Sequence, residues 1–325
     1  SSAWTLLGVS GAAYAWGWPA VWIFPSTVGG FLINWAWVAP RLQKIAANEQ
    51  AVTLSEVVAP ATIGSLRKII LRTAALIIVF CFTFYIASQF EAAGKAFESV
   101  FDMSKRNSIL TGAVIVLIYT LLGGFWAVSV TDSVQGILMA IAALVLPIVS
   151  LAAVGGFGPL FDGLAQIGNT GSPIVAGGVV AEFYVLGLMG IGITYPGQPH
   201  VVNRFLALKD EEALRQGRII ALTWAVLVYS GMLLLGLSAR VLFADLGDSE
   251  QVLFKTATEL LPPVVAGVML AAVLSAIMST ADSQLLVASS AIAYDWNLAD
   301  RDKKDGLTGT RRTVVFVLVM ATMLA

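Results

Sequence analysis

Long apolar stretches separated by short polar stretches dominate the hydropathy pattern of this chain. A helix that crosses a bilayer needs about 20 mostly apolar residues. Stretches of that kind lie at 17–39, 69–92, 108–126, 132–155, 179–196, 219–243 and 263–293. Two shorter apolar stretches lie near the chain ends, at 3–16 and 313–325. The pattern therefore predicts an all-α membrane protein with several spans.

Composition supports a membrane protein and argues against an enzyme. The chain is 58% hydrophobic and 12% charged, whereas a soluble globular protein carries about 25% charged residues. Cys81 is the only cysteine and His200 the only histidine in the sequence, so it provides no disulfide framework, zinc cluster or histidine-based catalytic triad. We therefore expect no enzymatic activity, no nucleic-acid partner and no obligatory protein partner.

The positive charges are unevenly divided between the two sets of alternating loops. Of the 19 Lys and Arg residues, 14 lie in or beside the loops at 40–68, 197–218 and 294–312, and 5 lie on the other side. Cytoplasmic loops are enriched in Lys and Arg. We therefore expect these three loops to be cytoplasmic.

The chain ends predict a fragment of a longer transporter-sized protein. The sequence opens without an initiating methionine or a signal peptide, and it stops inside the apolar run from Val314 to Ala325. No low-complexity linker divides it. We expect a single transmembrane domain over residues 1–325, truncated at both ends.

Several predicted spans contain residues that weaken a helix. Pro25, Gly29 and Gly30 lie in the first full span, Pro147 lies in the fourth, and Gly and Pro residues crowd 187–199. Broken helices of this kind form binding sites in many secondary transporters; ordinary kinking and close helix packing are the alternative. The segment from Tyr195 to Phe205 is typical of a helix that unwinds and then reaches the cytoplasm.

A polar stripe inside the span 263–293 indicates a cation site. Positions three and four apart share one face of a helix, so Ala276, Ser279, Thr280 and Ser283 form one column, with Asp282 beside it. An ionised Asp at mid-membrane costs about 2.5–3.5 kcal/mol, and Na⁺ is a suitable partner for hydroxyl and carboxylate oxygens. Alternatively, the hydroxyls bond to their own helix backbone and Asp282 is protonated or faces water.

Two further polar positions each have two interpretations. Asp132 follows the pair Gly123–Gly124 and is either a helix N-cap or part of a second cation site. Tyr85 is either an interior or interfacial aromatic residue or a ligand contact.

Three motifs resemble those of the sodium/solute symporter family, most closely its sodium/proline branch. They are Gly-Gly-Phe-Trp-Ala-Val-Ser-Val-Thr-Asp-Ser-Val-Gln at 123–135, Gly-Gln-Pro-His followed by Arg-Phe at 197–205, and Met-Ser-Thr-Ala-Asp-Ser-Gln-Leu-Leu-Val-Ala-Ser-Ser at 278–290. The resemblance implies a LeuT-like bundle of two inverted repeats. These would occupy 1–155, incomplete at its start, and 175–325, incomplete at its end.

The same resemblance implies two sodium sites. The first would use the backbone carbonyls of Ser1 and Ala276 with the hydroxyls of Ser279 and Thr280. A second site, present in some members, would use Asp132, Ser279, Asp282 and Ser283. Asp282 stands where those members have serine, so this site could be altered, strengthened or lost.

The substrate site implied by the proline branch is matched in part. Tyr85, Tyr195 and Pro199 match in place, whereas Ile191 stands where that branch has tryptophan. Gln198 and Ser2 are further candidates for polar contacts.

Together, these features predict Na⁺-coupled symport of a small organic solute by alternating access, with proline or a related amino acid favoured. Symport of another solute, such as a carboxylate, choline or sialic acid, is one alternative. The transporter-like sensor module of a membrane histidine kinase is another.

Overall fold

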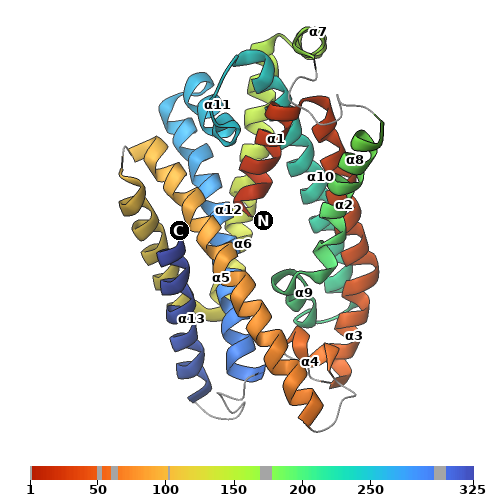
Figure 1. Cartoon of the computed structure of the whole chain (residues 1–325), viewed down its shortest axis with the longest axis vertical. Coiled ribbons are helices and arrows are strands. Elements are labelled where there is room, and N and C mark those ends of the chain that lie inside the picture. Colours follow the sequence, from red (N-terminus) through yellow and green to blue (C-terminus); the bar gives the residue numbers. More distant parts are fainter. Residues whose placement is uncertain (1, 50–52, 60–64, 102, 169–177, 296–304) are drawn as a thin grey trace. The chain divides into compact units, whose positions relative to one another are not determined.

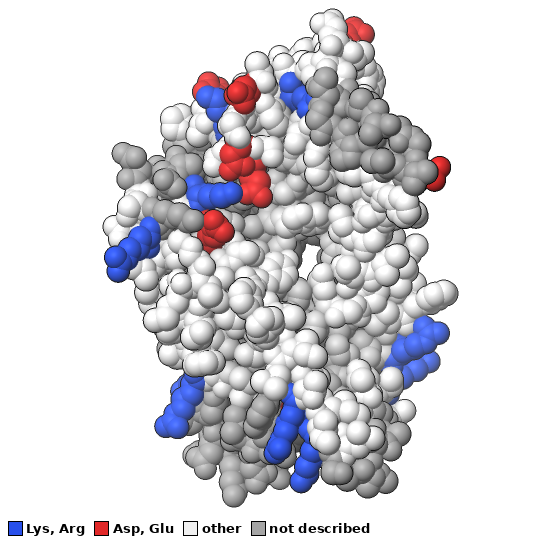
Figure 2. Space-filling model, viewed as in Figure 1, with Lys and Arg blue, Asp and Glu red and all other residues white. Residues whose placement is uncertain are grey.

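The computed structural model describes residues 2–49, 53–59, 65–101, 103–168, 178–295 and 305–325, and every element in these ranges is helical (Figure 1). Five helical stretches among them are long and apolar enough to cross a membrane: Trp18–Ala46, Leu66–Phe97, Val128–Val154, Glu211–Leu242 and Pro263–Ala293. Most atoms on the face seen in Figure 2 belong to uncharged residues. Apolar surface on this scale suits a lipid environment.

The chain divides into two compact units, each built from segments far apart in the sequence. The first comprises Ser1–Ile33, Val134–Tyr195 and Gly217–Ala276. It contains α1 (Val9–Trp16), α2 (Ile23–Ile33), α7 (Phe157–Ile167), α8 (Gly178–Ile193) and α11 (Val252–Leu260), together with most of α10 (Glu211–Leu242). A π-helical turn, Trp4–Gly8, precedes α1, and a 3-10 turn, Trp18–Trp22, precedes α2.

The second unit comprises Asn34–Ser133, Pro196–Gln216 and Ile277–Ala325. It contains α3 (Ala39–Glu49), α4 (Leu54–Val58), α5 (Ser65–Phe101), α9 (Pro199–Leu206) and α13 (Asp305–Leu324), with π-helical turns at Asn34–Val38 and Ala291–Asp295. Two long helices, α6 (Lys105–Val154) and α12 (Pro263–Ser290), contribute to both units. This division does not test the predicted inverted repeats, which remain a prediction.

A core of apolar side chains holds the second unit together. Phe82, Ile86 and Phe90 of α5 pack with Leu285 of α12 and Val317 of α13, and all five are buried. In Figure 1, α5 and α13 run side by side. The burial of each large apolar side chain contributes about 1.5–3 kcal/mol, so α12 is firmly positioned where it carries the polar stripe.

Close contact between α2 and α8 explains two of the glycines. A Cβ atom on Gly192 would lie 1.8 Å from the carbonyl oxygen of Ser26, and one on Gly30 would lie 2.3 Å from the carbonyl oxygen of Gly192. The Ser26 hydroxyl accepts from the Gly192 N–H at 2.8 Å and donates to the Met189 carbonyl at 3.0 Å. These glycines therefore allow the two helices to approach closely, as the packing alternative expected.

The predicted helix breaks are found in only some of the expected places. α8 ends at Ile193, a 3-10 turn covers Tyr195–Gly197, and α9 begins at Pro199, so the predicted unwinding is confirmed. The expected interruption at Pro25, Gly29 and Gly30 is wrong, because α2 continues through all three. Pro25 is the third residue of α2, shortly after the 3-10 turn Trp18–Trp22 changes to α-helix.

Two predicted spans differ from the helices observed. The spans predicted at 108–126 and 132–155 lie within one helical run, α6, in which Arg106–Ile118 is a shorter apolar segment. The span predicted at 179–196 corresponds to α8 and the 3-10 turn that follows it.

Candidate functional site

The polar stripe of α12 is buried, as the sequence predicted. Ser279, Thr280 and Ser283 are each at most 6% exposed, and Asp282 is fully buried. Four polar side chains in five residues are unusual in a helical stretch that is apolar enough to cross a membrane. Because buried polar groups need partners, this part of α12 is built around polar contacts.

The residues predicted for the first sodium ion lie partly outside the described chain. Ala276, Ser279 and Thr280 occupy consecutive turns of α12 and all three are buried. Ser1 lies outside the described residues. The set therefore remains a prediction, whose described members form one continuous stretch of a single helix.

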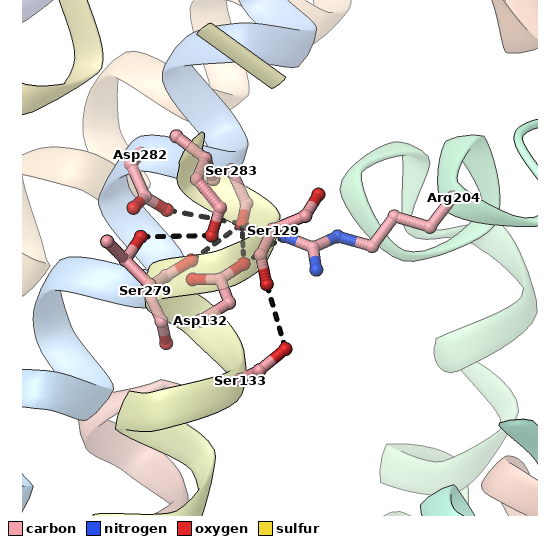
Figure 3. Close-up of polar contacts among 9 residues, drawn as sticks. Ser129, Asp132, Ser133, Arg204, Ser279, Asp282 and Ser283 are labelled. Carbon is pink, nitrogen blue, oxygen red and sulfur yellow. Dashed lines mark hydrogen bonds and ion pairs between the residues drawn. The ribbon is translucent and has the colours of Figure 1, made fainter. Parts of the chain in front are cut away.

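Asp132, Arg204 and Ser283 converge in the second unit (Figure 3). Nη2 of Arg204, on α9, donates to Oδ2 of Asp132, on α6, in an ion pair. The same nitrogen donates to the Ser283 hydroxyl of α12 at 2.6 Å. Three helices, α6, α9 and α12, thus meet at Asp132 and Ser283. These two residues belong to the predicted second sodium site, together with Ser279 and Asp282.

The Ser283 hydroxyl links this cluster to the helix backbone. Its oxygen lies 2.6 Å from the Ser279 carbonyl, 3.3 Å from Oδ1 of Asp282 and 3.5 Å from Oδ2 of Asp132. A hydroxyl carries a single proton, and the shortest contact directs it to the Ser279 carbonyl. The Ser283 oxygen can then accept from Arg204.

The N-cap interpretation of Asp132 is wrong. Asp132 lies inside α6 rather than at its start. Its carboxylate accepts from the Arg204 guanidinium, so its partner is a side chain of another helix rather than an N–H at a helix terminus.

The oxygen atoms of this cluster suit a hard cation such as Na⁺. Two carboxylates, the Ser283 hydroxyl and a backbone carbonyl gather on α6 and α12, and Oδ1 of Asp132 is buried with no hydrogen-bond partner among the described residues. Hard monovalent and divalent cations take oxygen ligands of this kind. Arg204 supplies a positive charge there in this structure.

The predicted substrate residues of the first unit lie in different surroundings. The Tyr195 hydroxyl lies 2.6 Å from that of Tyr229 on α10. The Phe31 ring centroid lies 5.2 Å from that of Tyr195 and 6.3 Å from that of Tyr229. Ile191 lies on α8 and its carbonyl accepts from the Thr194 hydroxyl, while Ser2 is buried beside Thr5.

Sequence reasoning missed the aromatic neighbours of Tyr195. Trp4 also contacts Tyr229, with ring centroids 6.5 Å apart. Phe31, Tyr195, Tyr229 and Trp4 thus form an aromatic group, and Tyr229 is 1% exposed. No local motif signals this group, because its members lie far apart in the sequence.

The predicted substrate residues of the second unit gather around His200. Tyr85 of α5 lies 6.3 Å from the His200 ring and Phe82 lies 5.4 Å from it, both edge-on. Gln198 precedes α9 and Pro199 opens it. Nδ1 of His200 is buried and has no hydrogen-bond partner in the described part of the chain. Tyr85 therefore lies close to the segment that carries Gln198 and Pro199.

A second buried carboxylate, absent from the sequence predictions, lies just beyond the end of α12. The Thr53 hydroxyl donates to Oδ1 of Asp295 at 2.8 Å and accepts from the Glu56 N–H that it caps. Burial raises the pKa of the Asp295 carboxyl above its ordinary value of 3.8. Nearby, the side-chain carbonyl of Asn203, on α9, accepts from the Leu54 N–H at 3.0 Å.

The sequence and fold are similar to those of known sodium-coupled transporters. The sodium/proline symporter of Escherichia coli (strain K12) is 36% identical over 90% of this chain and 60% of its own length. The osmoregulated proline transporter OpuE of Bacillus subtilis (strain 168) is 33% identical over the whole chain and 67% of its own length.

A solved structure of a Na⁺-coupled sialic acid symporter, in a substrate-bound outward-open state, matches 99% of this chain and 70% of its own. The TM-score is 0.83 at 16% sequence identity. This likeness shows the fold and confirms the predicted class, an all-α transporter bundle of the LeuT-like type.

The family model for sodium:solute symporters matches residues 1–325, the full length of the sequence. The chain spans about 60% of the length of the Escherichia coli relative. The three motifs that suggested this family lie on α6, on the turn leading into α9, and on α12, where the polar cluster forms. This chain is an integral membrane protein that belongs to the sodium:solute symporter family.

Proposed function

We propose that this protein couples the downhill entry of Na⁺ to the uptake of a small organic solute. The observation that carries the proposal is the buried group of oxygen atoms on α12 and α6, in a chain of this family. Burying such a group in a membrane helix is costly unless the oxygens bind something. A sodium ion is a suitable ligand for them.

In this proposal, α12 provides the contact with the first sodium ion. The hydroxyls of Ser279 and Thr280 and the carbonyl of Ala276 hold it, and Ser1 contributes a carbonyl from the start of the chain. Asp132, Asp282 and Ser283, together with Ser279, hold a second ion. Ion binding favours the conformation that accepts solute from outside, and the sodium gradient supplies the free energy.

Proline, or a related amino acid, is the solute that we favour. The similarity to two proline transporters supports this choice, as does the aromatic group around Tyr195, which offers apolar ring faces to a small cyclic solute. Tyr85, Gln198, Pro199 and Ser2 are the other proposed contacts. Ile191, in place of tryptophan, makes a different solute the main alternative.

We also propose an orientation in the bacterial inner membrane. The loops at 40–68, 197–218 and 294–312 would face the cytoplasm, because 14 of the 19 Lys and Arg residues lie in or beside them. Part of these loops, at 50–52, 60–64 and 296–304, lies outside the described residues.

The first experiment measures solute uptake into proteoliposomes that contain the complete gene product, with and without an inward sodium gradient. We expect Ser279→Ala and Thr280→Ala each to lower uptake at least about tenfold, because each removes a ligand worth about 1.4 kcal/mol or more. Ser289→Ala is the matched control: its hydroxyl is also buried on α12 but bonds to the Leu286 carbonyl. Wild-type uptake in both test variants would overturn the proposed sodium site.

A competition panel then identifies the solute. Labelled proline is tested first, against unlabelled proline, carboxylates, choline and sialic acid. Competition by proline alone supports the favoured solute. If another compound competes and proline does not, Ile191→Trp tests whether this position sets the preference.

A further inference from the structure

Arg204 binds the oxygens that the second sodium ion would need. A single guanidinium nitrogen of Arg204 contacts both Asp132 and Ser283, and Figure 3 shows the side chain extending from α9 to these two residues. A cation at the same oxygens would meet a positive charge at contact distance, and such charges repel strongly where water is scarce. Sodium and Arg204 would therefore compete for the oxygens of Asp132 and Ser283.

The exposure of these side chains shows which partner can leave. The Arg204 side chain is 39% exposed, whereas that of Asp132 is 12% exposed and Asp282 is fully buried. Arginine has a long side chain with several rotatable bonds and remains charged at any physiological pH. The guanidinium can thus move towards water, while the carboxylates stay fixed on α6 and α12.

The formal charge of the cluster leaves room for one more cation. With both carboxyl groups ionised, Asp132 and Asp282 contribute two negative charges and Arg204 contributes one positive charge, so these three side chains sum to −1. With serine at position 282, Arg204 alone would neutralise it. Asp282 therefore keeps the cluster attractive to a sodium ion even when Arg204 is bound nearby.

We propose that Arg204 is a tethered cation that holds Asp132 and Ser283 when sodium is absent and gives way when a second sodium ion binds, with Asp282 setting the strength of that binding. This inference rests on the proposed sodium-coupled function and concerns the regulation of its second site. The net charge of Asp132, Asp282 and Arg204 then determines sodium affinity.

The test measures binding of radiolabelled sodium to the purified complete gene product, without solute and without a gradient. Arg204→Gln gives a net charge of −2 and should lower the half-saturating sodium concentration about tenfold. Asp282→Ser gives a net charge of 0 and should raise it about tenfold. The double variant returns to −1 and should lie within about threefold of the wild type.

Two control variants separate charge balance from general effects. Lys209→Gln removes one positive charge from the exposed segment after α9 and should leave sodium binding unchanged. Arg204→Lys keeps the charge but loses the arginine geometry, and should fall between the wild type and Arg204→Gln. If Arg204→Gln does not fold, Asp282→Ser alone still tests the proposal, and an unchanged isotherm there overturns it.

The outcomes distinguish this inference from the proposed function. If the wild type binds sodium and all variants share its isotherm, the role of Arg204 is wrong while sodium coupling stands. If the isotherms shift as expected but no solute is taken up, the transport proposal is wrong and the role of Arg204 stands. If the wild type binds no sodium, the role of Arg204 is overturned as well.

Discussion

Two carboxylates in the second unit, Asp132 and Asp295, are withdrawn from water with different kinds of partner. Asp132 pairs with a full positive charge on Arg204. Asp295 accepts from the neutral hydroxyl of Thr53, and its side chain is buried. A charged partner favours the ionised carboxylate, whereas desolvation favours the protonated one.

The difference separates a charge-paired cluster from a neutral hydrogen-bonded contact. The cluster at Asp132 keeps negative charge inside the protein, balanced by a cation. The contact at Asp295 lies beyond the last residue of the apolar stretch Pro263–Ala293 and joins α4 to the end of α12 through a hydrogen bond. Three experiments sharpen this comparison, from the largest expected effect to the smallest.

Arg204→Leu should produce the largest loss of stability. It leaves the Asp132 carboxylate partly enclosed without its charged partner, which should cost about 2–3 kcal/mol in sodium-free buffer. The midpoint of thermal unfolding in detergent measures the loss. Adding sodium should recover part of it, since the ion replaces the missing charge.

Asp132→Asn in the Arg204→Leu background is the rescue variant for that experiment, because it removes the uncompensated charge. Arg215→Leu is the control, because Arg215 and Glu212 form an exposed ion pair that should leave the midpoint unchanged. A midpoint for Arg204→Leu equal to that of Arg215→Leu would contradict the comparison.

Thr53→Val should have an intermediate effect. It removes the hydrogen bond to Asp295 and the N-cap of α4, with an expected loss of about 1–2 kcal/mol. Hydrogen exchange at the Leu54 and Glu56 amides would locate the loss in α4. Thr53→Ser retains the hydroxyl and should behave as the wild type; equal exchange in the valine and serine variants would show that the hydroxyl is dispensable.

The pH dependence at Asp295 should be the smallest effect. Burial raises the pKa of its carboxyl above 3.8, and the hydrogen bonds of Ser55 and Thr53 and the charge of Arg67 offset only part of this rise. The folded state therefore holds the proton more tightly than the unfolded state does. Its contribution is complete below the ordinary pKa and is lost as pH rises through the raised pKa of the folded state.

Asp295→Asn cannot titrate, so its unfolding midpoint should lack this decline between the ordinary and the raised pKa. Unfolding midpoints of both proteins across the acidic range give the measurement. Parallel curves for wild type and variant would show that Asp295 does not carry the effect.

Local sequence patterns predicted the features that depend on local physics. Five of the predicted spans match helices that are long and apolar enough to cross a membrane. They could be predicted because helix length and hydropathy are properties of consecutive residues. The Gly and Pro residues of 187–199 predicted the end of α8 for a similar reason. The same local reasoning allowed an N-cap as one of two interpretations of Asp132, because sequence alone did not show that α6 continues through it.

Contacts between distant residues could not be predicted in this way. Thr53 and Asp295 lie 242 positions apart, and Tyr195 and Tyr229 lie 34 apart. Arg204 was counted with the cytoplasmic charges because its position near a span end suits that role, although it lies in one of the three family motifs. Only the placement of α9 against α6 and α12 shows that its guanidinium reaches Asp132.

Neighbouring residues on the short helix α9 bind the two regions compared above: Asn203 accepts from Leu54, and Arg204 donates to Asp132. We expect a rigid displacement of α9 that carries both residues to separate Arg204 from Asp132 and Asn203 from α4 together. Sodium binding at Asp132, Asp282 and Ser283 would then be thermodynamically coupled to the hydrogen bond between Asn203 and Leu54. Such coupling is reciprocal. A substitution in α4 that weakens the contact with Asn203 should therefore lower or raise the apparent ion affinity by the same factor by which ion binding changes the strength of that contact.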